Sequence, residues 1–275
     1  MRAIITGSNS GLGLHTAMEL AKQGYEVVLA VRSAERGALA AEQIRSRIPA
    51  ASIDIRNLDL SSLASVQAFA ESQASKPWNI LINNAGAKIE RPYKTTDDGF
   101  EWHQGVNHLG HFALTAGLWP ARASGAKVVT VSSIVARGAT LEQASSLPAT
   151  FNEGRAYADS KLLNLLFAMN LARLIQESGV EASSMCAHPG FARAEPYGTA
   201  LTRVAELALA QTAQQGSRCT IDALNRSNGS YVGPRIFELW GTPTILKKPL
   251  LAENSEALDY HWGEAERLTG IKFWV

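Results

Sequence analysis

The sequence predicts an α/β fold in which a doubly wound parallel sheet lies between two layers of helices. Short apolar or β-branched runs alternate along the chain with amphipathic segments, the pattern of repeated β-α-β units. A glycine-rich turn follows the first run directly, as expected where a strand passes into a helix. The 275 residues are 46% hydrophobic, which is enough for one large core.

Each element follows from local signals. The first helix, 12–23, ends at Gly24, a residue suited to a left-handed C-terminal position, and the second, 34–47, follows Ser33 and stops before Pro49. No repeat or linker interrupts the pattern, so we expect a single domain over 1–275. Two irregular regions, 134–156 and 191–228, are expected to contact substrate, and the helical-looking segment 201–225 predicts a small helical lid. The predicted strands are 3–6, 26–31, 52–58, 80–83, 127–132, 182–187 and 229–232.

Composition limits the function classes. The formal charge of +1 gives no reason to expect a nucleic acid or an anionic membrane surface as partner. Cys186 and Cys219 have no ligand-like spacing, which argues against a disulfide scaffold or structural zinc and predicts no metal site. The start of the chain lacks a signal-peptide pattern and no run approaches about 20 apolar residues. We therefore expect a cytoplasmic protein without a membrane anchor.

A phosphate-binding turn is predicted between the first strand and the first helix. Gly7, Gly11 and Gly13 would let the backbone turn tightly, so that its amides approach a pyrophosphate at the positive end of the helix dipole. The spacing is Gly-x3-Gly-x-Gly. The alternative is a glycine-rich turn with no ligand.

Arg32 ends the second strand, 19 residues after Gly13, where an acidic residue would bind the ribose hydroxyl of NAD. A guanidinium there suits a 2′-phosphate instead. This favours NADP(H) over NAD(H). The alternative is a solvated arginine near Ser33 and Glu35.

Polar residues follow three further strands, at the edge where ligands bind in such sheets. Asp59 and Leu60 follow the third, and Asp59 could equally cap the next helix. The segment 83–86, Asn-Asn-Ala-Gly, follows the fourth, and its amides need partners if buried. Ser133 follows the fifth, and Asn107 lies in a helical segment with apolar flanks. Either of these two could be a satisfied polar group of the core.

Tyr157 and Lys161 are four residues apart and can share one helical face. A free phenol titrates near ~10, so we expect the neighbouring ammonium to lower the pKa of Tyr157. Asn164 continues this face, and an apolar stripe occupies another. Such pairs also arise on ordinary solvated helices. The stripe consists of Leu162, Leu165, Leu166 and Met169.

These motifs, in this order, resemble the short-chain dehydrogenase/reductase superfamily over about residues 3–194, which implies a Rossmann-type fold. The stretches 30–33, 107–112, 156–164 and 186–190 look like the retinol dehydrogenase and protochlorophyllide reductase-like branch. That branch often has a longer separation between the site serine and tyrosine, and here 24 residues separate Ser133 from Tyr157.

The resemblance implies roles for matching residues. Tyr157 would be the general acid or base, with Lys161 lowering its pKa and holding the nicotinamide ribose. Ser133, rather than Ser132, would bind the substrate oxygen, and Asn107 would hold a water that links Lys161 to solvent. The implied cofactor contacts are Gly7, Ser10, Gly11, Leu12, Gly13, Arg32, Asp59, Leu60, Asn83, Ala85, Gly86, Tyr157, Lys161, Pro189 and Gly190.

The implied activity is hydride transfer between NADP(H) and a carbonyl or alcohol. Reduction of an activated C=C bond and a catalytically silent cofactor-binding sensor or scaffold are the alternatives. The mixed composition of the two irregular regions suggests a partly apolar small molecule, and the family analogy suggests a homodimer or homotetramer. Ala194 stands where the family often has threonine. Retinol dehydrogenases usually begin with a membrane segment, which we do not expect here, and this argues against a membrane retinoid as substrate.

Overall fold

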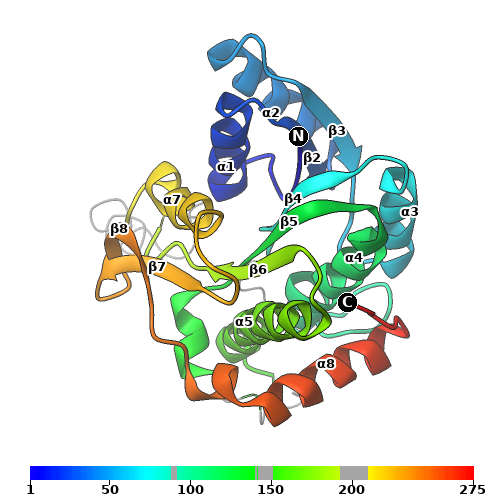
Figure 1. Ribbon diagram of the computed structural model, residues 1–275, viewed down its shortest axis with the longest axis vertical. Helices are drawn as coiled ribbons and strands as arrows, with labels where there is room; N and C mark the ends of the chain where they lie inside the picture. The colour runs from blue at the N-terminus through cyan, green and yellow to red at the C-terminus, as the bar shows by residue number, and fades with distance from the viewer. Residues whose placement is uncertain (88–91, 140, 142–150, 193–209) are drawn as a thin grey trace.

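The computed structural model describes residues 1–87, 92–139, 141, 151–192 and 210–275. Its central feature is an eight-stranded sheet with the order β3-β2-β1-β4-β5-β6-β7-β8 (Figure 1). All neighbouring strands pair in parallel except β7 and β8, which form an antiparallel hairpin at one edge.

Strands and helices alternate through most of the described chain. The strands are β1 (Arg2–Thr6), β2 (Glu26–Val31), β3 (Ile53–Asn57), β4 (Trp78–Asn83), β5 (Arg122–Val131), β6 (Ala182–Ala187), β7 (Tyr231–Ile236) and β8 (Trp240–Ile245). The α-helices are α1 (Gly11–Lys22), α2 (Ala34–Arg47), α3 (Leu63–Gln73), α4 (Gly110–Leu118), α5 (Glu153–Ser178), α7 (Ala213–Ala223) and α8 (Ser255–Thr269). The π-helix η1 spans Gln104–Leu109, and short 3₁₀ turns are η2 (Trp119–Ala121), η3 (Ile134–Gly138) and η5 (Leu250–Glu253).

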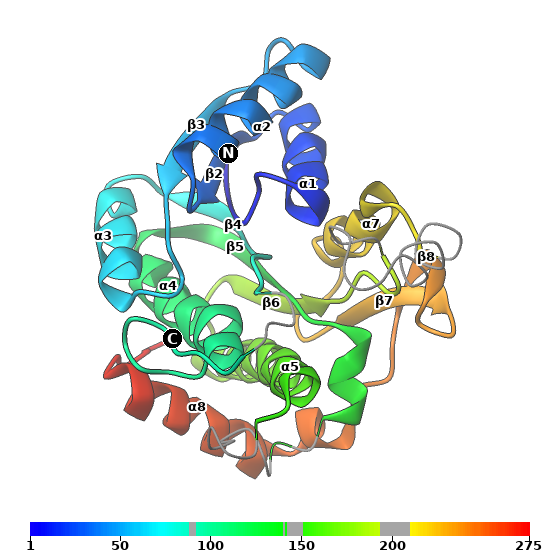
Figure 2. The same ribbon diagram turned by 180° about the vertical axis from the view of Figure 1, so that it is seen from behind.

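Helices cover both faces of the sheet. On one face α1, α2 and α7 pack over the strands, and on the other lie α3, α4 and α5, with α8 outside α5 (Figures 1 and 2). The predicted three-layer, doubly wound architecture is confirmed. A strand buried from both sides needs apolar residues without a break, which explains the continuous runs of β1, β2 and β4.

The strand order reverses beside β1, which pairs with β2 on one side and β4 on the other. In doubly wound sheets ligands bind beyond the carboxyl ends of the strands at such a reversal. The turn after Thr6 and the turn after Asn83 therefore lie side by side. These are the glycine loop and the Asn-Asn-Ala-Gly segment.

An aromatic cluster anchors the end of the chain. Phe112 of α4 and Phe167 of α5 contact Trp262 of α8, with ring centroids 5.2 and 5.7 Å from the indole. Phe273 packs against Phe112 and Trp119 at 5.8 and 5.5 Å. Aromatic residues close to the C-terminus thus cover the helices α4 and α5 on this side of the sheet.

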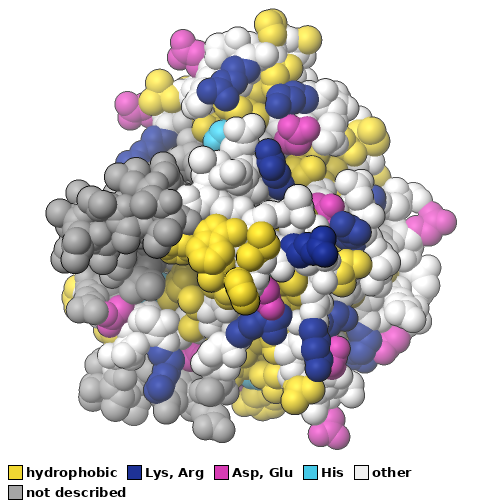
Figure 3. All heavy atoms as spheres, turned by 90° about the vertical axis from the view of Figure 1, so that its left-hand side faces the viewer, with side chains coloured by type: hydrophobic (Ala, Val, Ile, Leu, Met, Phe, Trp, Pro, Cys, Tyr) yellow, Lys and Arg dark blue, Asp and Glu magenta, His cyan; other side chains and the backbone are white. Residues whose placement is uncertain are grey.

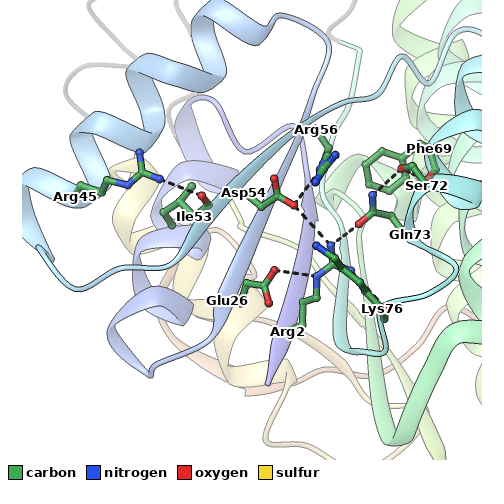
Figure 4. Close-up of polar contacts among 10 residues, drawn as sticks. All are labelled: Arg2, Glu26, Arg45, Ile53, Asp54, Arg56, Phe69, Ser72, Gln73 and Lys76. Carbon is green, nitrogen blue, oxygen red and sulfur yellow. Dashed lines mark hydrogen bonds and ion pairs between the residues drawn. The ribbon is translucent and has the colours of Figure 1, made fainter.

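The opposite, amino-terminal edge of the sheet carries a paired charge network (Figure 4). Arg2 is 4% exposed, and its guanidinium lies 3.3 Å from a Glu26 oxygen and 3.9 Å from an Asp54 oxygen. It also bonds to the Gln73 side chain and the Lys76 carbonyl. Each nitrogen of this buried guanidinium thus has an acceptor, as a structural ion pair requires.

The predicted elements match the structure closely in the first half. The bounds of α2 agree with the prediction, and Ser33 caps it by accepting a bond from Arg36. Strand β8 was not predicted. The second part of the predicted 201–225 helix is α7, which packs against α1 as a layer helix, whereas 193–209 lies outside the described residues. The substrate lid therefore stays a prediction.

Candidate active site

The glycine loop brings β1 against the end of β4. Gly7 has φ +63, and a Cβ there would lie 2.8 Å from the Ala85 Cα. A Cβ on Gly13 would lie 2.5 Å from both the Asn84 amide nitrogen and the Gly7 carbonyl oxygen. Side chains are excluded at both positions, so the close approach of the two loops depends on glycine.

Helix α1 begins without a side-chain cap. Its N-cap residue Ser10 is extended and makes no capping hydrogen bond, and the first turn holds no acidic residue. Gly11 has φ +54, and no atom lies within 4 Å of the Cβ it lacks. The first amides of α1 thus lack a capping side chain among the described residues, which leaves them available to a pyrophosphate.

A buried network that we did not predict holds the two loops together. Thr6 Oγ1 accepts from the amides of Asn84 and Ala85, both at 2.9 Å, and lies 2.9 Å from His111 Nε2. His111 Nδ1 lies 2.8 Å from the Asn107 carbonyl, which only accepts, so Nδ1 carries the proton and Nε2 accepts from Thr6. Burial lowers the pKa of His111 to about 4, which keeps this ring neutral.

Asn107 lies in the π-helix η1, and its side chain is fully buried. Its Oδ1 accepts from the Ala87 amide at 2.6 Å, and its Nδ2 donates to Ser160 Oγ at 2.9 Å. A Cβ on Gly86 would lie 3.4 Å from this Oδ1 and 3.3 Å from Lys161 Nζ. The structure therefore brings Gly86, Asn107 and Lys161 together.

Lys161 is a buried cation with no carboxylate partner among the described residues. It is 4% exposed, and its Nζ donates to the Val131 carbonyl at 3.3 Å. Burial lowers the pKa of Lys161 to about 8, because the charged form is poorly solvated there. An ammonium in this state has unused hydrogen-bonding capacity directed at the site.

Tyr157 corrects one prediction about electrostatics. Its pKa is raised, because the loss of water around the largely buried phenol outweighs the lowering effect of a hydrogen bond with Ser133. Lys161 Nζ lies 5.9 Å from the centre of the Tyr157 ring. The expected lowering of the Tyr157 pKa by Lys161 is not found in this structure, where burial and the hydrogen bond with Ser133 set the pKa.

The two serines after β5 are directed differently. Ser132 is buried, and its hydroxyl donates to the Lys161 carbonyl at 2.6 Å, which ties α5 to the sheet. Ser133 is half-exposed and lies beside Tyr157. The geometry thus agrees with the choice of Ser133 as the residue that faces the site.

Sequence reasoning did not identify the ring system beside Tyr157. His103 contacts Tyr157 edge-on, with centroids 6.2 Å apart, and stacks on Phe151 at 6.4 Å. Its Nδ1 lies 2.7 Å from Glu101. The pair Glu101 and His103 lies about fifty residues from Phe151 and Tyr157 in the sequence, and no local motif joins the two groups.

The other predicted cofactor-binding residues around this edge differ in their exposure and in their hydrogen bonds. Arg32 is exposed and forms no ion pair among the described residues, so the phosphate and solvent interpretations both stay open. Asp59 does not cap α3, whose cap is Ser62, and instead accepts from Ser61. Leu60 packs in the core, and Leu12 is half-buried in the glycine loop.

Asn83 departs most from its expected role. Its side chain is fully buried and donates to Thr115 at 3.0 Å and Thr130 at 3.4 Å. It reaches into the core, so a cofactor contact there would have to use the backbone of the strand end.

The loop after β6 lies under the β7–β8 hairpin. Gly190 has φ +70, and a Cβ there would lie 2.6 Å from the Leu239 carbonyl oxygen. Pro189 is held through its carbonyl, which accepts from the Gln211 side chain at 3.2 Å. Ala194, where the family often has threonine, lies outside the described residues.

Two searches of the described residues gave negative results. None of the helices there is both long and apolar enough to cross a membrane. No group of three or more potential metal ligands occurs in the same residues.

Comparison with known proteins agrees with the arrangement. The family model for short chain dehydrogenases matches residues 1–196. Human retinol dehydrogenase 11 is 42% identical over 197 residues, which are 70% of this chain and 61% of that protein. Human retinol dehydrogenase 12 is 35% identical over 284 residues, covering 98% of this chain and 86% of the relative. The first match thus spans about three fifths of its relative.

A solved structure supports the same assignment. An uncharacterized protein from Mycobacterium paratuberculosis superposes with a TM-score of 0.83 at 36% identity, covering 100% of this chain and 95% of that one. The matching family model covers the glycine loop, the Asn-Asn-Ala-Gly segment and the Tyr157–Lys161 pair. The chain therefore belongs to the short-chain dehydrogenase family.

Proposed function

We propose that this protein is an NADP(H)-dependent oxidoreductase that transfers hydride between the nicotinamide and a carbonyl or alcohol carbon. The observation that carries the proposal is the convergence of Gly86, Asn107 and Lys161 at the carboxyl edge of the sheet, one helical turn from Tyr157. The family match supports the reaction class, and the relatives are named as dehydrogenases of an alcohol.

In this proposal each residue has a defined task. Tyr157 donates its proton to the substrate oxygen during reduction, and its raised pKa keeps that proton in place at neutral pH. Ser133 donates a hydrogen bond to the same oxygen as negative charge develops there. Lys161 offers its free donors to the ribose and to a water, held by Asn107, that would link Lys161 to solvent. When bound, the nicotinamide cofactor supplies or accepts the hydride.

The cofactor would occupy the open edge of the glycine loop. The uncapped start of α1 would hold the pyrophosphate, and Pro189 and Gly190 would lie against the nicotinamide. Arg32 would bind the 2′-phosphate, since it is exposed and has no ion-pair partner among the described residues. These assignments favour NADP(H) over NAD(H).

The substrate proposed is a mid-sized, partly apolar carbonyl or alcohol. The rings of His103 and Phe151 stack beside Tyr157, with Tyr93 5.3 Å from Phe151, so the approach to the phenol has aromatic walls. Retinol, from the relatives' names, is an elongated apolar alcohol and belongs in the first screen. Two free buried cysteines suit a reducing compartment, so we infer a cytoplasmic location. A homodimer or homotetramer remains a prediction.

The test is a cofactor-coupled absorbance screen of apolar and polar aldehydes, ketones and alcohols, with products identified by mass and NMR. We expect apolar carbonyls to become alcohols with NADPH. Tyr157→Phe should abolish turnover and leave the NADPH dissociation constant unchanged. A product saturated at a C=C bond, or activity retained by Tyr157→Phe, would contradict the mechanism.

Cofactor choice has a separate test. Arg32→Glu should raise the NADPH dissociation constant about 10–100-fold, because a charge-assisted contact to phosphate is worth about 1.5–3 kcal/mol. Arg45→Glu is the matched control, an exposed arginine at the far end of α2. Equal NADPH affinities for the two variants would remove Arg32 from the cofactor site.

A further inference from the structure

The tip of the β7–β8 hairpin has a backbone that its residues disfavour. Phe237 and Glu238 have φ +49 and +59, and the Leu239 amide bonds to the Ile236 carbonyl at 2.9 Å. This is a turn with two consecutive left-handed residues, the positions that Asn and Gly usually occupy. Because Phe and Glu tolerate this backbone conformation poorly, their presence at the turn suggests that one of the two side chains has a role.

The carboxylate of Glu238 holds the segment that follows Ser133. It accepts from Arg137 Nε at 2.6 Å, and Arg137 Nη2 donates to the Lys247 carbonyl at 2.7 Å. Arg137 lies in η3, four residues after Ser133. The hairpin is thus fastened by a charged bond to the segment that carries the proposed oxygen-binding serine.

The same carboxylate faces the loop that follows β6. His188 Nε2 lies 3.4 Å from the Glu238 oxygen that binds Arg137. His188 Nδ1 accepts from the Gly190 amide at 3.1 Å, and burial lowers the pKa of His188 to about 4. The ring is therefore neutral, and its Nε2, which carries the proton, lies near the Glu238 carboxylate without a hydrogen bond to it.

The backbone of the turn adds further contacts to this loop. The Leu239 carbonyl accepts from the Phe191 amide at 3.0 Å and from Gln211 Nε2 at 2.9 Å. A Cβ on Gly190 would lie 2.6 Å from that carbonyl and 3.0 Å from the Glu238 carbonyl. The loop that would lie against the nicotinamide therefore rests directly on the hairpin turn.

We propose that Glu238 is a positioning residue: its carboxylate fastens the hairpin turn to the segment behind Ser133, and the backbone of the same turn holds the loop at Pro189–Gly190. The coupling fixes the spacing between the place where the substrate oxygen binds and the place where the nicotinamide binds. An Asn-Gly turn would remove the backbone strain but would lose the carboxylate. The proposal rests on the function proposed above.

The tip of the hairpin is exposed to solvent. The hairpin exposes Ile236, Phe237 and Ile245, and hydrophobic side chains gather near the middle of the face that carries α7, β7 and β8 (Figure 3). Phe237 is 83% exposed, so its replacement tests the turn without disturbing packing.

The kinetic test uses Glu238→Gln, Glu238→Ala, Arg137→Ala and the double alanine variant. We expect kcat to fall about 10–100-fold in each, because a misplacement near 1 Å costs up to about 10²-fold, while the NADPH dissociation constant stays unchanged. Glu238→Asp, which keeps the charge, should recover part of kcat. The double variant should be no slower than the slower single variant, since both remove one interaction.

Two control variants separate positioning from stability. Phe237→Asn relieves the strained turn and keeps Glu238, so kcat should be unchanged. Glu264→Gln removes an exposed carboxylate that pairs with Arg267 at 2.9 Å on α8, and should also leave kcat unchanged. Multiplicative losses in the double variant, or a Glu238→Gln enzyme as fast as Glu264→Gln, would overturn the proposal.

A readout without turnover separates this proposal from the proposed function. In hydrogen–deuterium exchange, Glu238→Gln should increase exchange in both 134–139 and 186–192. Faster exchange confined to 236–241 would overturn the coupling. If wild-type protein turned over no carbonyl or alcohol while both segments still responded together, the proposed function would fail and the coupling would stand.

Discussion

The two ends of the sheet each bury one cation, and they treat it differently. Arg2 at the amino edge and Lys161 at the carboxyl edge are both 4% exposed. Arg2 lies within 3.9 Å of two carboxylates and also bonds to Gln73. Lys161 reaches only backbone carbonyl oxygen, at 3.3 Å, among the described residues.

This difference separates a structural charge from the charge that we propose to act in catalysis. The carboxylates that pair with Arg2 offset the loss of its hydration, so replacing Arg2 should lower the free energy of unfolding. Lys161 lacks that compensation, its pKa falls to about 8, and its donors stay available. Equal burial with unequal pairing thus distinguishes the two edges, and four experiments can test the distinction.

The largest effect is expected for Lys161→Met. Turnover should fall about 10²–10⁴-fold, the usual range for a group that assists proton transfer. The free energy of unfolding in urea should stay the same or rise, because an uncompensated charge is replaced by an apolar chain. Lys127→Met, at a lysine that donates to the Leu224 carbonyl at 2.7 Å, should retain turnover. A strongly destabilised Lys161→Met would contradict the contrast.

Arg2→Met should show the reverse behaviour. It leaves the buried Gln73 acceptor unpaired and frees Glu26, so the free energy of unfolding should fall by about 1–3 kcal/mol. Turnover per folded molecule should be unchanged. The measurement is urea unfolding followed by kinetics at a temperature where both proteins are folded. Full stability in Arg2→Met would mean that the network of Figure 4 is dispensable.

The third prediction concerns pH. The pKa of Lys161 is about 8 in the folded protein and has its ordinary value of 10.5 in the unfolded chain, so between these pH values the unfolded chain holds a proton that the folded chain has released. Stability attributable to Lys161 should rise with pH across this window, by at most about 1.4 kcal/mol per pH unit. This stability attributable to Lys161 should be lost as the pH falls through 8. The difference in unfolding free energy between wild type and Lys161→Met isolates this slope, and a flat difference would show a normal pKa.

The smallest effect is expected for Asp54→Asn. This carboxylate pairs with Arg56 at 2.9 Å and lies 3.9 Å from Arg2, but it is partly exposed. Such pairs contribute about 0.2–1 kcal/mol, and salt screens them. Urea unfolding at low and high salt measures both quantities. If Asp54→Asn lost as much free energy of unfolding as Arg2→Met, Asp54 would supply most of the stability that the network contributes.

Sequence alone predicted the elements whose signals are local. Gly24 and Ser33 set the ends of α1 and α2, and continuous apolar runs marked the buried strands. Strand β8 was missed because its sequence contains Gly241 and Pro243. Its partner β7 is joined to it through a turn at Phe237 and Glu238 that lacks the usual residues.

The site was predictable as a set of residues and less so as an electrostatic arrangement. Tyr157 and Lys161 follow from spacing, but the raised pKa of Tyr157 depends on burial by distant segments. The same limit applies to His103 and His111, whose partners lie elsewhere in the fold. Asn83 matched the motif, yet its side chain reaches core threonines that no short pattern specifies.

The π-helix at Gln104–Leu109 gives the helix an extra residue just before α4 continues from Gly110. In an α-helix successive residues are about 100° apart, so deletion of one residue here would turn Asn107 away from Ala87 and Ser160. Lengthening or shortening the chain at this point would therefore move the Asn107 side chain out of contact with Ala87 and Ser160 while α4 kept its place. Insertions and deletions, more than substitutions, are the changes to which this segment is sensitive.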